Sequence, residues 1–164
     1  MKPIAPVNEA AVEWTRQGHG ERFSMSRKLL GHAAGGVELG CSLVEVPPGR
    51  RSVPFHAHLG NEEALYVLAG EGALRLPDRE VPLRPGDYVA LPAGHQSAHQ
   101  VLNSSGATLR FLALSTMRFP EVVVYPDSKK VYAIAGPTGA QKDQRTFSSI
   151  FPLGSQVDYW VGED

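Results

Sequence analysis

The sequence predicts an all-β protein, either an antiparallel barrel or a sandwich. Thirteen prolines and 17 glycines separate short stretches rich in valine, leucine, tyrosine and threonine, a pattern typical of many short strands joined by turns. Turn signals such as Pro47-Pro48-Gly49 and Gly70-Glu71-Gly72 recur at short intervals, which leaves no room for long crossover helices. Strands are expected at residues 22–30, 37–46, 63–69, 73–76, 80–83, 88–91, 96–103 and 108–115.

The two ends of the chain lie outside this run of strands. Residues 8–16 are expected to form a short helix, with Asn8 as its N-cap. The whole chain, 1–164, is interpreted as one domain, with a barrel core at about 37–115 and a C-terminal extension at 120–164. Within the extension a brief strand is expected at 131–135. The apolar end of the extension, which includes Tyr159 and Trp160, predicts packing on the barrel.

Composition excludes some classes of partner. Sixteen basic and 17 acidic residues give a net charge of −1, so no basic field favours nucleic acid or an anionic membrane. No apolar run approaches the length of a membrane span. The only cysteine, Cys41, cannot form an internal disulfide, and a lone thiol suits the cytoplasm. A small-molecule ligand in a cytoplasmic protein is therefore expected.

One stretch places potential metal ligands close together. His56 and His58 are two residues apart, so in an extended strand both imidazoles lie on the same face. Glu63 has the wrong parity for an uninterrupted strand, but Gly60 and Asn61 can turn the chain and bring its carboxylate to the same side. The neighbouring Glu62 should then face outward as a surface charge.

A second stretch, residues 85–103, supplies further histidines, His95 and His99, from a different hairpin. Closing the barrel brings this hairpin towards the first. Three imidazoles and one carboxylate suit zinc, iron(II), manganese, nickel or copper, and are too nitrogen-rich for calcium or magnesium. Four protein ligands around an octahedral ion leave two positions for water or substrate.

Both stretches resemble the signature motifs of the cupin superfamily. The first follows the pattern glycine, spacer, His-x-His, four residues, glutamate, six residues, glycine, and is matched by Gly49, His56, His58, Glu63 and Gly70. The second, with glycine, Pro-x-Gly, histidine and asparagine, is matched by Gly86, Pro92, Gly94, His99 and Asn103. Six residues separate Gly49 from His56 and four separate Gly94 from His99, where the family pattern has five and two. The loop that contains His95 is thus longer than in the family.

The resemblance implies a double-stranded β-helix, or jelly-roll, cupin barrel with a short N-terminal extension and a C-terminal tail packed on the barrel. It implies one divalent ion, Zn, Fe, Mn or Ni, held by His56, His58, Glu63 and His99. His99 is chosen over His95 because only His99 has an asparagine, Asn103, at the family spacing. The length and residues 121–128 further resemble bacterial single-domain cupins, some of which carry the label sugar-phosphate isomerase.

The leading functional hypothesis is a metal-dependent enzyme that acts on a small, polar, oxygen-rich molecule. Isomerase or lyase chemistry would use the ion as a Lewis acid, and oxygenase chemistry would require iron. Candidates for proton transfer are Tyr66, Tyr88, His95 and Gln100. The alternatives are a non-catalytic small-ligand-binding or sensor cupin and a purely structural metal.

Two further expectations concern surfaces. The strand at residues 63–69 is apolar on both faces, so the tail or a second subunit should cover Tyr66 and Leu68, and a homodimer is expected. Four arginines on predicted strands or turns are able to meet a substrate anion but are expected to be mostly solvated, namely Arg50, Arg51, Arg75 and Arg110.

Overall fold

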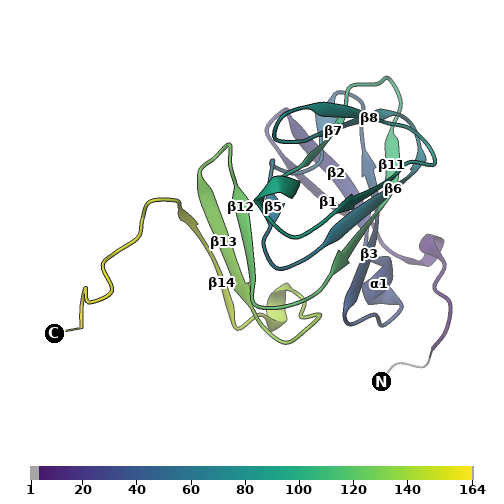
Figure 1. The fold of residues 1–164 in the computed structure, drawn as a ribbon. Coiled ribbons are helices and arrows are strands. Elements are labelled where there is room, and N and C mark those ends of the chain that lie inside the picture. Colours follow the sequence, from purple (N-terminus) through teal and green to yellow (C-terminus); the bar gives the residue numbers. More distant parts are fainter. Residues whose placement is uncertain (1–3, 164) are drawn as a thin grey trace.

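Two β-sheets of ten and four strands face each other in the computed structural model of the protein, which describes residues 4–163 (Figure 1). The first strands along the chain are β1 (Thr15–His19), β2 (Phe23–Lys28), β3 (Leu39–Val46), β4 (Arg50–Arg51), β5 (Ala57–His58), β6 (Glu63–Ala69) and β7 (Gly72–Arg75). They are followed by β8 (Glu80–Leu83), β9 (Tyr88–Leu91), β10 (Gln100–Asn103), β11 (Leu109–Thr116), β12 (Glu121–Tyr125), β13 (Lys130–Ala135) and β14 (Phe147–Pro152).

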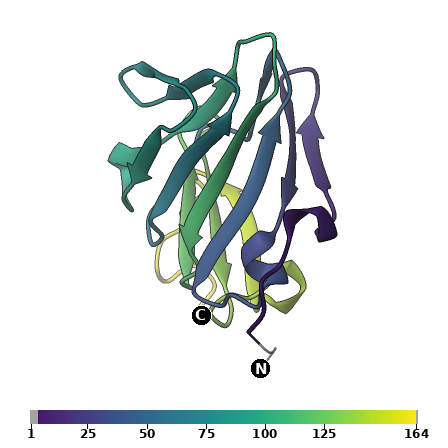
Figure 2. The same cartoon turned by 90° about the vertical axis from the view of Figure 1, so that its right-hand side faces the viewer.

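The larger sheet has the order β8-β7-β10-β4-β2-β3-β11-β6-β9, with β1 paired to β2, and the smaller has the order β14-β13-β12-β5. Figure 2 shows the strands of the larger sheet side by side. Nearly all pairings are antiparallel, and neighbours in space are often distant in sequence, as β4 is from β10 and β3 is from β11. The predicted all-β, double-stranded β-helix fold is confirmed.

Helix is a minor component, with one short α-helix, α1 (Leu30–Ala33), and three 3-10 turns, η1 (Glu9–Ala11), η2 (His95–Ser97) and η3 (Lys142–Gln144). No helix within residues 4–163 is long and apolar enough to cross a membrane. Asn8 does cap η1, because its side chain accepts a hydrogen bond from the amide of Ala10 at 2.9 Å. The helix expected over 8–16 nevertheless ends after one turn, since Thr15 and the residues after it pair with β2 instead.

Strand prediction succeeded best where turn residues flank the strand closely. β6, β8 and β9 begin and end at the predicted residues, while residues 96–103 were predicted too long because η2 occupies their start. The prediction missed five strands, which are β1, β4, β5, β12 and β14.

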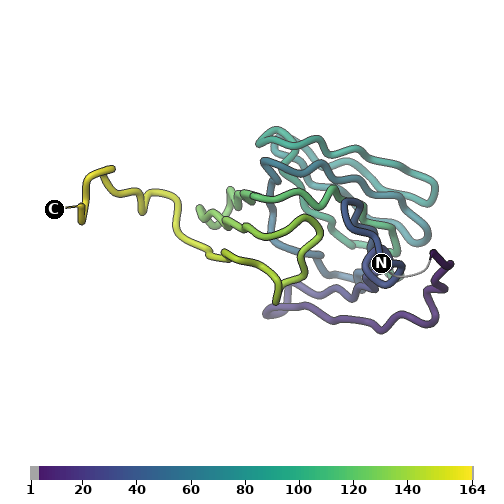
Figure 3. Tube along the Cα trace, turned by 90° about the horizontal axis from the view of Figure 1, so that it is seen from below, coloured from purple at the N-terminus to yellow at the C-terminus, as the bar shows by residue number. Residues whose placement is uncertain are grey.

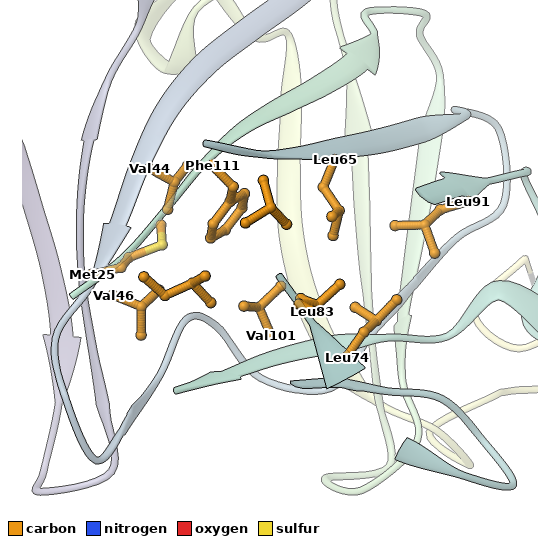
Figure 4. Packing of buried hydrophobic residues seen from close by; sticks show 11 residues of the cluster. Met25, Val44, Val46, Leu65, Leu74, Leu83, Leu91, Val101 and Phe111 are labelled. Atoms are coloured by element: carbon orange, nitrogen blue, oxygen red, sulfur yellow. The ribbon is translucent and has the colours of Figure 1, made fainter. Parts of the chain in front are cut away.

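The hydrophobic core fills the space inside the curled larger sheet (Figure 4). Its members alternate along their strands, as Val44 and Val46 do on β3 and Leu65 and Val67 do on β6. Gly70, a glycine of the first motif, allows two backbone segments to pack closely at the end of β6. Gly70 has φ +76°, and a Cβ there would lie 2.3 Å from the carbonyl oxygen of Thr108, so no larger residue fits without moving the backbone.

The chain changes sheets between the two halves of the first motif. β5 carries His58 and pairs with β12 of the smaller sheet, whereas β6 begins at Glu63 and pairs with β11 and β9 of the larger one. This crossing is why Glu63 faces the histidines despite its parity. His99 comes from before β10 and joins His56 in an isolated bridge, so the second hairpin meets the first at this point.

The C-terminal extension divides into two parts. Residues 121–152 complete the smaller sheet through β12, β13 and β14. Residues 153–163 instead extend away from the barrel (Figure 3), and Tyr159 and Trp160 are 82% and 70% exposed. For this last segment the prediction of packing was wrong, because no surface within residues 4–163 receives it. It does not cover Tyr66 or Leu68 either, since each remains 40% exposed.

Candidate metal centre

The four residues predicted as metal ligands lie together between the two sheets. Glu63 is central: its Oε2 is 3.3 Å from Nε2 of His99 and 4.0 Å from Nε2 of His56, and its Oε1 is 3.4 Å from Nε2 of His58. One ligand atom from each of His56, His58 and Glu63 lies within 4.8 Å of the other two. The ring centroid of His99 is 4.6 Å from that of His56.

These separations suit a shared ion. Ligand atoms about 2.0–2.2 Å from one metal lie roughly 3 to 4.4 Å from each other, and the nitrogen-to-oxygen distances around Glu63 fall in or near that range. Imidazole nitrogens with one carboxylate form a donor set for divalent transition metals. The residues present therefore fit the metal that the motifs imply.

Backbone carbonyls fix the orientation of two rings. Nδ1 of His56 donates to the carbonyl oxygen of Pro54 at 2.9 Å, and Nδ1 of His99 donates to that of Ser97 at 3.0 Å. A carbonyl oxygen has no proton to give, so Nδ1 must carry the hydrogen in each ring. The lone pair of a neutral ring then sits on Nε2 and points towards Glu63. Such outer hydrogen bonds are typical of metal-binding histidines.

The electrostatics of the cluster keep His56 and Glu63 in the forms that bind metal. Burial, aided by the neighbouring rings of His99 and His58, lowers the pKa of His56 to about 4, so this ring is neutral near pH 7. Burial alone would raise the pKa of Glu63, but the nearby histidines, led by His99, lower it to about 2. A neutral imidazole therefore faces an ionised carboxylate across a short gap.

Glu121, at the start of β12, is a member of this centre that the sequence reasoning missed. It is 3% exposed, and its Oε2 lies 3.8 Å from Nδ1 of His58. Its Oε1 accepts hydrogen bonds from the amides of Leu59 and Gly60 at 3.2 Å each, and its Oε2 accepts one from the side chain of Asn61. A buried carboxylate behind a metal-binding imidazole is a recurrent means of orienting the ring.

The Glu121 carboxylate also sets the charge of His58. Burial acts to lower the pKa of His58, but Glu121 and Glu63 outweigh burial and raise it. The pKa of Glu121 itself is lowered, because the nearby ring of His58 and hydrogen bonds from Gly60 and Asn61 overcome the effect of burial. In the sequence, Glu121 stands at the head of a Val-Val-Val-Tyr run within the segment 121–128 that resembles some bacterial cupins. Neither feature indicates which strand this run pairs with.

The residues that competed for the site lie elsewhere. His95 is exposed on η2, and Glu62 is exposed beside Glu63. Asn103, which identified His99 by its spacing, is a structural residue: its side chain donates to the carbonyls of Val46 and Ala107 at 2.7 and 2.8 Å. It closes the turn after β10 and so fixes the strand that follows His99.

A cavity of about 400 Å³ opens beside the cluster and is lined by all four predicted ligands and Glu121. This volume lies within the usual range for small-molecule sites. Apolar core side chains such as Leu65 and Phe111 form part of its wall. The four candidates for proton transfer do not line it in the described part of the chain, and three of them, Tyr66, Tyr88 and His95, are exposed on the outside.

None of the four arginines singled out in the sequence lines this cavity. Arg75 is bound to Asp127 by two hydrogen bonds of 2.6 and 2.9 Å. Arg110 pairs with Glu9 at 2.5 Å and lies 3.6 Å from Glu45. The arginines that do line the cavity are Arg27, Arg118 and Arg145, which the sequence reasoning did not identify.

Comparison with known proteins points to one family. The sequence model described as Cupin domain matches residues 42–115. A sugar phosphate isomerase from a cupin superfamily, from Silicibacter pomeroyi, has a crystal structure with a TM-score of 0.75 and 26% identity over 93% of this chain and 96% of that one. A candidate sugar phosphate isomerase from Acidithiobacillus ferrooxidans has a TM-score of 0.70 and 29% identity over 82% of this chain and 80% of its own.

A curated relative, the oxalate-binding protein of Thermotoga maritima, is 35% identical over 71 residues. The match covers 43% of this chain and 56% of the relative, so the chain spans little more than half the length of that protein. The family match falls on the strands that carry both motifs, and the solved relatives share the fold over most of the chain. The chain belongs to the cupin superfamily.

Proposed function

We propose that the protein binds one divalent transition-metal ion through His56, His58, Glu63 and His99, and that it is a metal-dependent enzyme for a small oxygen-rich molecule. One observation carries this proposal. The hydrogen bonds to Pro54 and Ser97 direct Nε2 of His56 and Nε2 of His99 at the carboxylate of Glu63. A nitrogen lone pair and a carboxylate that face one another repel, and a cation between the two removes the repulsion.

The reaction class follows from the residues that line the cavity and from the ion that they would hold. A bound divalent ion supplies Lewis-acid chemistry at substrate oxygens, and iron would add oxygenase chemistry. Glu63 and the three histidines hold the ion at the cavity wall, Glu121 orients His58, and the apolar wall limits water around the substrate. Isomerase or lyase activity on a sugar phosphate is supported by two solved relatives described as sugar phosphate isomerases, one of them as a candidate.

A non-catalytic ligand-binding protein is the second candidate function. It is favoured by the position of Tyr66, Tyr88 and His95, three of the candidates for proton transfer, outside the cavity. A curated relative that matches part of the chain is an oxalate-binding protein. This function predicts saturable binding of a small oxygen-rich acid without turnover.

Both functions are tested on protein stripped with a chelator and reloaded separately with zinc, manganese, nickel or iron(II). We expect about one ion per chain in the wild type and in the matched control Glu62→Gln, and much less in Glu63→Gln. Exchange of carbon-bound hydrogen in aldose and ketose phosphates, followed by NMR in D₂O, then reports isomerase chemistry, and oxygen uptake reports oxygenase chemistry. Binding without turnover with every metal would support the second candidate. Equal metal content in Glu63→Gln and Glu62→Gln would overturn the metal site.

Homodimer formation and a cytoplasmic location stay predictions. The dimer is supported by the exposed apolar side chains of residues 153–163 and by Tyr66 and Leu68 on the outer face of β6, which together offer more apolar surface than a monomer usually exposes. Removal of residues 153–164 should shift the protein from dimer to monomer in light scattering, and an unchanged mass would contradict a role of this segment. The cytoplasm is supported by the lone Cys41.

A further inference from the structure

The cavity contains a second polar group of residues besides the metal centre. Arg27 and Arg145 line the same cavity as His56, His58, Glu63 and His99. The two arginines are close enough for the charge of Arg145 to lower the pKa of Arg27, although burial lowers it more. They come from opposite ends of the chain, β2 and the residue after η3.

Arg27 faces the interior because of its place on β2. It is two residues after Met25, which belongs to the core, and two before Leu29, which lines the cavity. Alternate residues of a strand share a face, so the side chain of Arg27 is directed into the barrel. Its strand partners are the buried Val44 on β3 and Thr15 on β1.

Arg145 is held by the C-terminal extension. The amide of the next residue, Thr146, donates to the carbonyl oxygen of Ala135 at 2.9 Å, which fixes the backbone against the end of β13. Its Nη1 donates to the hydroxyl oxygen of Tyr132 at 2.6 Å, and this hydroxyl also contacts the hydroxyl of Ser148 at 2.9 Å. One guanidinium edge is thus positioned by the protein.

The positive charges of these arginines are not balanced by the chain. Among residues 4–163, the only acidic side chains that line the cavity are Glu63 and Glu121, and both lie beside the histidines. Neither Arg27 nor Arg145 forms a salt bridge within residues 4–163, and the buried Nε of each lacks a hydrogen-bond partner there. Two neighbouring, partly buried cations without a counter-charge destabilise a fold, and such arrangements are typical of ligand sites.

We infer that Arg27 and Arg145 form a binding subsite for the phosphate group of a phosphorylated small molecule. A phosphate monoester carries a charge of about −1.5 to −2 near pH 7, which matches two guanidinium groups better than one carboxylate does. Arginine also presents paired N–H donors to phosphate oxygens. One consequence of the subsite rests on the proposed function: the substrate would be phosphorylated at one end and would present oxygens to the metal at the other.

The subsite is tested without metal, so that phosphate cannot bind there through the ion. Chelator-treated wild type, Arg27→Gln, Arg145→Gln and the control Arg84→Gln are titrated with inorganic phosphate and, separately, with oxalate, by calorimetry and thermal melting. Arg84 is the matched control because its side chain is 79% exposed. We expect phosphate to bind the wild type and Arg84→Gln alike, and each subsite variant to raise the Kd about tenfold or more.

A second readout separates ligand binding from a structural role. Loss of one of two repelling cations should leave the melting temperature of phosphate-free Arg27→Gln equal to or above that of the wild type, whereas loss of a structural residue would lower it. A lower melting temperature with unchanged phosphate affinity, or no phosphate binding by the wild type, would overturn the subsite. Tighter binding of oxalate than of phosphate would overturn the assignment to phosphate.

The subsite and the metal proposal can fail separately. His58→Ala should retain phosphate binding in the chelator-treated protein, since it leaves both arginines in place. Phosphate binding that depends on Arg27 in a protein that takes up no metal would keep the subsite and remove the proposed enzyme function. The reverse result, metal uptake without a phosphate site, would keep the metal centre and remove the subsite.

Discussion

The two polar groups of the cavity differ in charge and in how the fold builds them. Around Glu63, Nε2 of each of three imidazoles lies within 4.0 Å of one carboxylate, and a second carboxylate, that of Glu121, lies behind His58. Arg27 and Arg145 bring positive charge to the same cavity, and neither forms a salt bridge within residues 4–163. One group is arranged to receive a cation and the other an anion, so the cavity suits a molecule that carries both a metal-binding and a phosphate-bearing end.

The two polar groups of the cavity also differ in how their side chains are held in place by the rest of the protein. Two histidines of the metal centre, His56 and His99, donate to backbone carbonyls, and the carboxylate of Glu121 lies 3.8 Å from Nδ1 of His58. The arginines have one such partner between them, Tyr132. The metal centre is therefore preorganised before any ligand arrives, whereas the arginine pair depends on its ligand for charge balance.

The largest expected effect comes from a core residue that belongs to neither group. Leu74 is fully buried and does not line the cavity, so Leu74→Ala should lower the free energy of unfolding by about 2–5 kcal/mol. Urea denaturation measures this. Metal and phosphate affinities of the folded variant should stay as in the wild type, and a selective loss of one would show that the two groups are not as local as described.

Removal of a metal-ligating side chain should have the next largest effect. We expect His58→Ala to weaken metal binding by more than about 100-fold, because loss of an outer partner alone costs about 10–100-fold. Competition with a chromophoric chelator measures the affinity. His95→Ala is the control, since His95 is exposed on η2; a comparable loss in that variant would mean that the loop histidine binds the ion.

Glu121→Gln tests the outer partner of His58. The substitution keeps the shape of the side chain and removes the charge beside Nδ1, so metal affinity should fall by about 10–100-fold while the wild-type fold remains by circular dichroism. Glu62→Gln removes an exposed charge nearby and should change nothing. An unaltered affinity in Glu121→Gln would limit Glu121 to its hydrogen bonds with Gly60 and Asn61.

The smallest expected effect concerns the hairpin that carries both Glu121 and Tyr132. Asp127, in the turn of this hairpin, binds Arg75 on β7 and has a lowered pKa for that reason. Asp127→Asn should cost about 0.2–1 kcal/mol of stability, as exposed ion pairs do. Because the pKa is lowered on folding, this contribution is present above the unfolded pKa of aspartate and is lost as the pH falls through the lowered value.

Melting curves of wild type and Asp127→Asn should therefore converge in acid, and Asp78→Asn serves as a control because Asp78 pairs only with its neighbour Arg79. A difference between wild type and Asp127→Asn that persists unchanged at pH 2 would rule out this ion pair as its cause.

The sequence revealed the metal centre more fully than the rest of the cavity, for physical reasons. His56 and His58 follow the two-residue period of a strand, and Asn103 distinguished His99 from His95 through a turn that depends on local spacing. Glu121 and Arg145 reach the cavity through strand pairings between distant segments, such as β12 with β5. Long-range register of this kind leaves no local pattern in a single sequence.

The same distinction separates the predicted strands from the missed ones. β6, β8 and β9 lie between tight turns, and they were located to the residue. β1 and β14 are exposed edge strands whose partners, β2 and β13, determine them. The exposed segment after β14 was predicted to pack because of its apolar composition, and composition does not say which surface covers it.

Anomalous X-ray diffraction at the absorption edge of the loaded metal tests the metal centre most directly. Crystals grown from protein reloaded with that metal should show one strong peak bonded to Nε2 of His56, His58 and His99 and to the carboxylate of Glu63. A peak bonded to other residues, or none in this cluster at full metal loading, would contradict the account.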